Sequence, residues 1–415
     1  MTPEVAMRLA LAQARRASGR TFPNPPVGAV VFRGERVLGR GCTQPVGGAH
    51  AEIVAIDAAL RRHGSVALRG ATIAVTLEPC SHQGRTPPCA NRLIEVGLSR
   101  AWVGHRDPHP AVAGRGLARL ARAGVRVEVG VLEDACREQH RGFLCATASG
   151  RPFVTLKLAA TLDGRIATAA GESRWISGPV ARAAAHRLRR RVDAVWVGSE
   201  TALADDPELT ARSGGRVVHR PLRLVADTRL RLPPSARLLR GAPGSTWVLC
   251  GAGAPRARRR ALEAAGARVL ELPREGRHLD LRRALRRLGQ EGLTEILVEG
   301  GGSLAAGLLR RSLVDEVHWF TAPMLIGADG RPALGALGAR RLARATRLVT
   351  VSVRRVGDDV HWIGRLQVSR SERRPSGAQR GEAERRSNEK ASEDQRQVSR
   401  SEPKASEDQR RGRAR

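Results

Sequence analysis

The sequence predicts an α/β protein of two domains followed by a disordered tail. Two observations carry this prediction: short apolar runs alternate with helix-length segments through most of the chain, and the composition changes at Gln367. Alternating strand and helix signals are typical of a mainly parallel sheet with helices on both faces. The 415 residues also suffice for two or three domains of about 100–200 residues each.

In the first half, the spacing of apolar residues predicts four helices and four strands. Helices are expected over residues 3–18, 49–62, 89–96 and 112–122, and strands over residues 28–32, 71–77, 101–103 and 125–129. Small and turn-forming residues at positions 148–152 then interrupt the pattern. We therefore expect a first domain of residues 1–147.

The second half repeats this style and predicts a second domain of residues 151–366. Strands are expected over residues 153–158, 194–197, 222–226, 246–249, 268–271, 295–298 and 316–320. Arg-rich helices are expected between some of them, over residues 181–191 and 279–288. The predicted architecture is again α/β.

Residues 367–415 form a tail of different composition. They contain no aromatic residue, and their only branched aliphatic residues are Val368 and Val398. The segments QVSRSE and KASEDQR each occur twice within them. Because such a segment cannot bury enough apolar surface to offset the entropy of ordering, we predict that the tail is disordered.

The net charge of +32 first suggests a nucleic acid or another polyanion as partner. Lysine occurs only at Lys157, Lys390 and Lys404, however, so 69 of the 72 basic residues are arginine. Such a lopsided choice indicates a general coding bias toward arginine, which selects no partner. We therefore expect no nucleic-acid partner.

Other features bound the environment of the protein. No stretch approaches the roughly 18–20 consecutive apolar residues of a membrane span, and the N-terminus shows no secretory signal. Six cysteines in 415 residues are too few for a disulfide scaffold. We expect a cytoplasmic protein without a membrane partner.

One histidine and two cysteines in the first half predict a zinc site. His50 opens a helix, Cys80 follows an apolar strand, and Cys89 heads another helix eight intervening residues later. Three such ligands leave a fourth position for water, as in catalytic zinc sites. Glu52 lies two residues beyond His50, where a carboxylate can move protons between the water and a leaving amine.

Each of these elements is uninformative alone, because a His-x-Glu pair is common and a free cysteine is more often a small core residue. Together, however, they occur in the right order, each at the start of a helix or after a strand. This combination favours a zinc site over coincidence. The remaining cysteines we interpret as small core residues: Cys42, Cys136, Cys145 and Cys250.

The chain resembles the bifunctional deaminase/reductase family of riboflavin biosynthesis. The segments LEPCSHQGRTPPC at residues 77–89 and TFPNPPVG at residues 21–28 carry the resemblance, which extends over residues 1–366. It implies a cytidine-deaminase-like three-layer first domain that hydrolyses the 2-amino group of a diaminopyrimidinone ribosylamine 5′-phosphate. His50, Cys80 and Cys89 would hold one Zn²⁺, Glu52 would be catalytic, and Asn24 would contact substrate.

The chain departs from the family pattern at a few positions. Cys42 and Thr43 stand where the family has an aromatic residue followed by His, which alters one expected substrate contact. Arg115 replaces a frequent Lys, and His109 and His140 replace Asn. We interpret His109 and His140 as surface histidines or as histidines with internal partners.

The second half contains a reductase-like constellation around Lys157, the only lysine of residues 1–366. A compact ammonium retained in a chain that otherwise uses arginine suggests a specific need. Glycines at residues 300–302 follow a strand and precede a helix, where backbone amides can approach a pyrophosphate. A tight turn explains those glycines equally well, because they do not form the dinucleotide fingerprint.

The resemblance implies a dihydrofolate-reductase-like second domain that uses NADPH to reduce the ribosyl group to ribityl. The cofactor would contact Ala159, Trp175, Thr201, Asp205, Thr228, Gly301, Gly302, Ser303 and Leu304, within a loop of residues 301–307. The substrate would contact Lys157, Ser173, Arg189, Leu209, Arg212 and Glu299. Arg189 and Arg212 suit a 5′-phosphate as planar forks. The family also implies a homo-oligomer, a dimer or tetramer.

Two other functions fit parts of the sequence. An RNA or nucleobase zinc deaminase would use the basic surface, but the paucity of aromatic residues and the second domain speak against it. A polyanion-binding protein with a degenerate site would bind RNA in a strongly salt-dependent manner.

Overall fold

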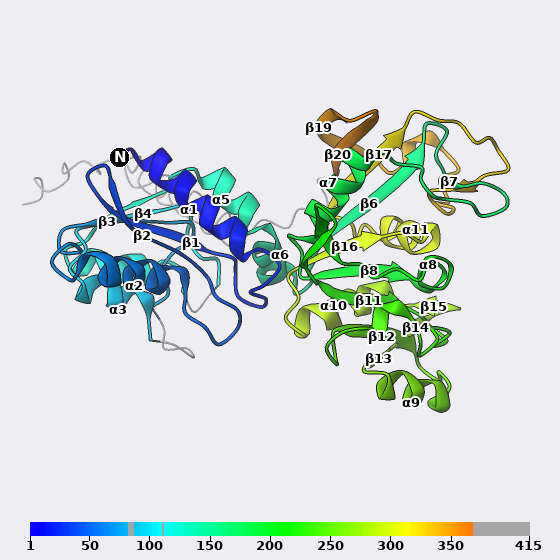
Figure 1. The fold of residues 1–415 in the computed structure, drawn as a ribbon, viewed down its shortest axis with the longest axis horizontal. Helices are drawn as coiled ribbons and strands as arrows, with labels where there is room; N and C mark the ends of the chain where they lie inside the picture. Colours follow the sequence, from blue (N-terminus) through cyan, green and yellow to red (C-terminus); the bar gives the residue numbers. More distant parts are fainter. Residues whose placement is uncertain (82–86, 110–111, 368–415) are drawn as a thin grey trace, which may run out of the picture. The chain divides into compact units, whose positions relative to one another are not determined.

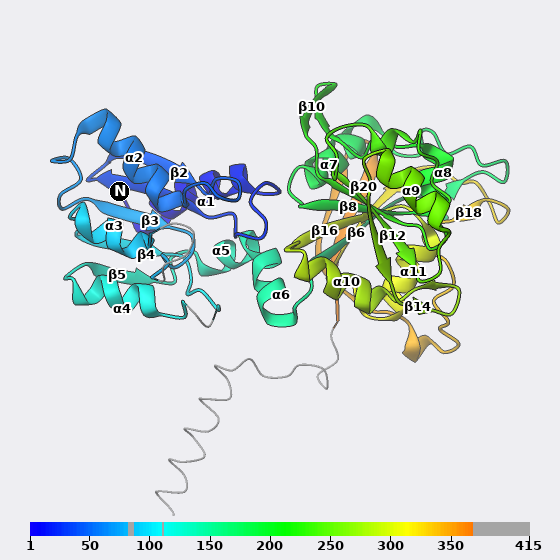
Figure 2. The ribbon, with the colours of Figure 1, turned by 90° about the horizontal axis from the view of Figure 1, so that it is seen from below.

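The computed structural model describes residues 1–81, 87–109 and 112–367 (Figures 1 and 2). The tail predicted to be disordered therefore lies outside the described residues, except for Gln367, as does most of the segment between Cys80 and Cys89. Within the described part, one sheet of five strands and one of nine strands organise the two halves of residues 1–366.

The five-stranded sheet has the order β2-β1-β3-β4-β5. Its strands are β1 (Gly28–Arg33), β2 (Arg36–Cys42), β3 (Thr72–Val75), β4 (Arg100–Val103) and β5 (Arg126–Val129). Strand β1 runs antiparallel to β2 and β3, whereas β3, β4 and β5 are parallel to one another. The parallel part brings the ends of β3 and β4 to one edge of the sheet.

Helices cover both faces of this sheet because both faces are apolar. Along β1, Ala29 and Val31 belong to one buried cluster and Val30 and Phe32 to another. The first cluster is covered by α2 (Ala51–His63), α3 (Cys89–Glu95) and α4 (Arg115–Arg122), and the second by α1 (Pro3–Ala17) and α5 (Glu133–Gln139). Figure 1 shows α1 and α2 on opposite sides of these strands. The result is three layers.

After α6 (Arg141–Ser149), the chain enters a nine-stranded sheet of order β13-β12-β11-β8-β16-β6-β17-β20-β19. The strands are β6 (Phe153–Thr161), β8 (Ala194–Gly198), β11 (Leu222–Ala226), β12 (Thr246–Gly251), β13 (Arg268–Leu272), β16 (Glu295–Glu299), β17 (Glu316–Ala322), β19 (Leu348–Val356) and β20 (Asp359–Leu366). The first seven strands in this order are parallel to one another. Strand β20 then pairs antiparallel with β17, and β19 pairs antiparallel with β20.

Each face of the nine-stranded sheet has its own core. The larger core buries α10 (Leu281–Gln290) and α11 (Gly302–Arg310) against Leu156, Trp196 and Ile296. The opposite face packs against α7 (Pro179–Arg189), α8 (Ser199–Asp205) and α9 (Arg256–Ala264). Short elements complete this half: β7 (Arg165–Ala167), β9 (Ala211–Ser213), β10 (Arg216–His219), β14 (Arg274–Glu275), β15 (His278–Leu279), β18 (Arg331–Pro332) and two 3-10 turns (Arg237–Leu239, Leu342–Arg344).

The α/β class and the predicted strands are confirmed, whereas several elements escaped the sequence patterns. No strand was expected at β2, β19 or β20, and no helix at α5 or α6. The expected loop of residues 301–307 is wrong, because α11 begins at Gly302. Among the described residues, none of the helices is both long and apolar enough to cross a membrane.

Candidate active sites

The three predicted zinc ligands meet at one end of the five-stranded sheet. His50 is the N-cap residue of α2, Cys89 is the first residue of α3, and Cys80 lies in the loop after β3. Their ligand atoms all lie within 4.8 Å of one another, and among the described residues no other group of His, Cys, Asp or Glu converges in this way. The packing of α2 and α3 on the same face of the sheet brings these three side chains to one point.

The donor set fits Zn²⁺ in geometry and in chemistry. The Nδ1 atom of His50 lies 3.3 Å from the Cys89 sulfur and 3.6 Å from the Cys80 sulfur. A tetrahedral zinc ion with bonds of about 2.1 Å to nitrogen and about 2.3 Å to sulfur separates such atoms by about 3.6 Å. Hydrogen bonds from Cys89 lower the pKa of the Cys80 thiol to about 4, although burial opposes them.

Glu52 lies beside these ligands, in the first turn of α2. Its side chain is buried and is hydrogen-bonded to Cys89. Burial, together with the nearby Cys80 sulfur, raises the pKa of Glu52 to about 7. A carboxyl group of this pKa can accept and release a proton near neutral pH.

Glu78 supports the cysteine loop, a role that the sequence did not suggest. Its carboxylate accepts backbone N–H bonds from Asp107, Gly114 and Gly116, at 3.2, 3.0 and 3.0 Å. These bonds tie the segment before Cys80 to the start of α4. The only sequence signal was an acidic residue at the end of an apolar strand.

A cavity of about 560 Å³ opens at the carboxyl ends of β8, β11 and β16 in the nine-stranded sheet. Ligands of α/β proteins bind at this edge of a parallel sheet. Gly301, with φ of +84°, leads directly into α11. A Cβ atom at Gly302 would lie 3.2 Å from the Gly335 nitrogen, so glycine lets the segment around Gly335 pack closely on the start of α11. The edge therefore fits the phosphates of a dinucleotide.

The cavity contains some of the predicted cofactor residues and omits others. Thr228, Gly301, Ser303 and Leu304 line it. The lining omits Ala159, Trp175, Thr201, Asp205 and Gly302, and the Trp175 side chain is exposed. The lining also includes Arg229, Arg231 and Arg277, which the sequence did not single out because arginine is frequent throughout the chain.

Three of the predicted substrate residues lie together on the face of the sheet that α7 covers. Lys157 on β6 is in register with Glu299 on β16. Arg189 of α7 binds the Glu299 carboxylate through two nitrogens, at 2.6 and 2.9 Å. Burial raises the pKa of Glu299, but Arg189 and Lys157 outweigh it and hold this pKa below its ordinary value. Arg189 therefore already has an anionic partner within the protein.

The other predicted substrate residues are more scattered. Arg212 is exposed and forms an ion pair with Glu208. The Leu209 side chain is buried in an apolar cluster, which leaves its backbone for any contact with substrate. Ser173 lies in the segment before Trp175, and Asn24 lies in the loop before β1.

The remaining histidines and cysteines follow the predictions in part. His140 is buried and hydrogen-bonded to His105 and Thr76, at 2.9 and 3.2 Å, and His109 is exposed. Cys136 and Cys250 are buried, as expected for small core residues. The same prediction is wrong for Cys42 and Cys145, which are only half-buried.

The two folds and their sites define a two-domain enzyme in which a zinc deaminase precedes a reductase. Residues 1–105 match the model of the cytidine and deoxycytidylate deaminase zinc-binding region, and residues 152–362 match the RibD C-terminal domain. The riboflavin biosynthesis protein RibD of Escherichia coli is 40% identical over 88% of this chain and 100% of its own length. That of Bacillus amyloliquefaciens is 37% identical over 86% of this chain and 94% of its own.

Solved structures of related proteins have the same fold as this chain. RibD of Acinetobacter baumannii superimposes with a TM-score of 0.77 at 34% identity, covering 88% of this chain and 99% of its own. A diaminohydroxyphosphoribosylaminopyrimidine deaminase/5-amino-6-(5-phosphoribosylamino)uracil reductase of Thermotoga maritima superimposes with a TM-score of 0.75 at 31% identity, with the same coverage. The chain belongs to the RibD family and is a bifunctional deaminase and reductase of riboflavin biosynthesis. The nucleic-acid deaminase and polyanion-binding alternatives are not favoured.

Proposed function

We propose that the chain catalyses two consecutive steps on a phosphorylated pyrimidine. The first is zinc-dependent hydrolytic deamination of 2,5-diamino-6-(5-phosphoribosylamino)pyrimidin-4(3H)-one. The second is reduction by NADPH of the ribosyl group of 5-amino-6-(5-phosphoribosylamino)uracil to ribityl. The observation that carries the proposal is the convergence of His50, Cys80 and Cys89 beside the buried Glu52.

In the deaminase site, His50, Cys80 and Cys89 would hold the metal, and Glu52 would do the proton chemistry. Bound Zn²⁺ would lower the pKa of a water molecule and so supply a nucleophile at neutral pH. Glu52 takes the proton of the attacking water and delivers it to the leaving amino group. Asn24 would hold the substrate.

In the reductase site, the edge at β8, β11 and β16 would bind the cofactor, and bound NADPH would supply a hydride. The N-terminus of α11 would receive the pyrophosphate. In this proposal Lys157 on β6 would serve the reacting end of the cofactor, and Thr228, after β11, would contact its adenosine end. Lys157 and Glu299 orient the sugar, with Arg189 holding the Glu299 carboxylate.

Three arginines at the adenosine end favour NADPH over NADH as the cofactor. Arg229, Arg231 and Arg277 line the cavity near Thr228. Guanidinium groups bind phosphate strongly and in fixed geometry, so they suit the 2′-phosphate that only NADPH carries. The cytoplasmic location and the homo-oligomer expected from the sequence stay predictions.

The test follows both reactions in one preparation. Zinc-loaded full-length protein is incubated with the diaminopyrimidinone phosphate, and ammonia release and NADPH oxidation are measured separately. We expect ammonia without NADPH, and NADPH oxidation only after deamination. Failure to release ammonia from this substrate by fully zinc-loaded protein would contradict the proposed first step.

A further inference from the structure

The loop of residues 21–27 connects α1 to β1 and carries Asn24. Within the loop, the Thr21 hydroxyl donates to the Asn24 carbonyl at 2.9 Å, and the Asn24 N–H donates to the Thr21 carbonyl at 2.8 Å. These bonds shape a turn around Asn24. The turn needs support from outside, because fixing the backbone of each residue costs about 1–2 kcal/mol of conformational entropy.

One support comes from the second domain. Phe22 is half-buried and packs against the larger core of the nine-stranded sheet, whose members lie between Val154 and Val317. The next residue, Pro23, lies against Gly292, where an added Cβ atom would be 3.1 Å from the Pro23 Cβ. A Cβ atom at Gly19 would likewise lie 2.7 Å from the Val192 carbonyl oxygen. The loop thus rests directly on the reductase.

A second support comes from the junction between α5 and α6. The His140 ring is buried, donates to the Pro26 carbonyl, and lies 3.2 Å from the Thr76 hydroxyl. One residue earlier, the Gln139 amide donates to the Ser18 hydroxyl at 2.9 Å. The junction therefore holds both ends of the segment from Ser18 to Pro26.

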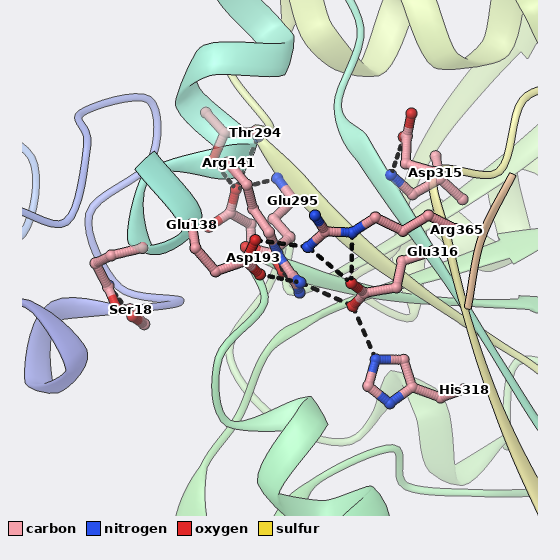
Figure 3. A network of polar contacts seen from close by, with 12 residues as sticks. Ser18, Glu138, Arg141, Asp193, Thr294, Glu295, Asp315, Glu316, His318 and Arg365 are labelled. Carbon is pink, nitrogen blue, oxygen red and sulfur yellow. Dashed lines mark hydrogen bonds and ion pairs between the residues drawn. The ribbon is translucent and has the colours of Figure 1, made fainter. Parts of the chain in front are cut away.

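The junction is itself anchored to the reductase by a cluster of charges (Figure 3). Arg141 donates to Glu138 at 3.0 Å, to Glu295 at 2.5 Å and to Glu316 at 2.8 Å. Arg365 closes a ring by binding Glu138 at 2.6 Å and Glu316 at 3.2 Å. Arg141 and Glu316 are both largely buried, so screening by solvent is weak.

We propose that the reductase domain braces the substrate loop of the deaminase, and that Phe22 is the positioning residue through which it does so. The proposal rests on the proposed function, since it takes Asn24 as a substrate contact. The Phe22 ring contributes nothing to the chemistry. Its packing against the reductase core orders the loop before substrate arrives, so that binding does not carry this entropic cost.

The test replaces Phe22 by alanine in the full-length, zinc-loaded protein. We expect the KM of deamination to rise about tenfold while kcat stays within twofold, because substrate binding weakens and Glu52 chemistry does not change. Phe22→Leu, which still packs against the core, should have a KM close to that of the unmodified chain. Zinc content and NADPH binding should match the unmodified chain in both variants.

Leu348→Ala is the matched control. Leu348 packs on the same core from β19, which is the edge strand of the nine-stranded sheet. It should cost similar stability and leave the deaminase KM unchanged. If Phe22→Ala and Leu348→Ala raise the KM equally, or if neither raises it, the brace does not exist. If Phe22→Ala does not fold, the KM of Phe22→Val is compared with that of Leu348→Ala instead.

Failure of this proposal and failure of the proposed function look different. If the unmodified protein does not deaminate the diaminopyrimidinone phosphate, the proposed function is wrong. If it does, and its KM is insensitive to the side chain at position 22, only the brace is wrong.

Discussion

His140 and Arg141 are consecutive residues whose side chains bind different domains. The His140 ring is hydrogen-bonded to Thr76 and His105 of the five-stranded half. The Arg141 guanidinium binds Glu295 and Glu316, which begin strands of the nine-stranded half. The two anchored residues are thus joined by a single peptide bond, which restricts movement of the deaminase relative to the reductase at this point.

Replacing Glu52 by alanine should stop deamination and spare reduction. General acid–base catalysis contributes about 10²- to 10⁴-fold, so we expect the deaminase kcat to fall by at least about 100-fold. Ammonia release measures the first activity, and NADPH oxidation with the deaminated substrate measures the second. Normal deamination by the variant, with zinc bound, would remove Glu52 from the proton transfer.

Removal of zinc should likewise separate the two activities. Cys80→Ser weakens a donor set whose ligand atoms lie within 4.8 Å of one another. We expect loss of bound zinc, measured by atomic absorption, and loss of deamination, while NADPH oxidation persists. Cys136→Ser, at a buried cysteine outside the ligand set, is the control and should keep its zinc. Retention of a full zinc complement by Cys80→Ser would refute the ligand assignment.

Breaking the pair between Arg189 and Glu299 should destabilise the reductase domain. Arg189→Met leaves a buried carboxylate without its guanidinium partner, which typically costs about 3–5 kcal/mol. The double variant Arg189→Met, Glu299→Leu should recover much of the stability in urea unfolding but none of the reductase activity. Arg212→Met, which breaks an exposed pair with Glu208, should change the free energy of unfolding by less than about 1 kcal/mol. If Arg189→Met and Arg212→Met lowered the free energy of unfolding equally, burial of the Arg189–Glu299 pair would not matter to stability.

Arg229 and Arg277 should set the preference for NADPH. Both line the cavity beside Thr228. We expect the variant Arg229→Ser, Arg277→Ser to bind 2′,5′-ADP at least about tenfold more weakly, because charged hydrogen bonds to phosphate contribute roughly 1.5–3 kcal/mol. Binding of 5′-AMP, measured by calorimetry, should change little. Arg286→Ser on the exposed side of α10 is the control. An unchanged 2′,5′-ADP affinity would place the 2′-phosphate elsewhere.

His140 should make the protein sensitive to mild acid. Burial, with a contribution from His105, lowers the pKa of His140 to about 3, against an ordinary value of 6.5. The unfolded chain therefore binds a proton below pH 6.5 that the folded chain refuses, and stability falls as the pH drops toward 3. Between pH 7 and pH 5 this amounts to about 2 kcal/mol.

His140→Gln keeps a donor for the Pro26 carbonyl and cannot titrate. Its free energy of unfolding should fall less between pH 7 and pH 5, by about the same 2 kcal/mol. Urea unfolding at the two pH values measures the difference. An identical loss of stability in both proteins would show that other groups carry the acid sensitivity.

The main strands of both sheets could be predicted from local patterns, whereas several short or exposed elements could not. The helix expected over residues 3–18 is α1, and the strand expected over residues 28–32 is β1. Strand β19 was missed because its arginines and exposed valines show no buried face, and it is ordered by pairing with β20. Helix α6 was missed because it is short and packs between both domains.

The sequence itself pointed to the zinc ligands and Glu52, because the chemistry of metal binding restricts the residue types and because His50 and Cys89 stand where helices start. The glycines at residues 300–302 stood out in the sequence, but a tight turn explained them equally well. Only the tertiary structure decided that Phe22 packs against the core of the other domain and that Arg141 binds Glu295 and Glu316. These partners lie up to hundreds of residues apart. Their pairing depends on how sheets and helices pack, which no local pattern of side chains encodes.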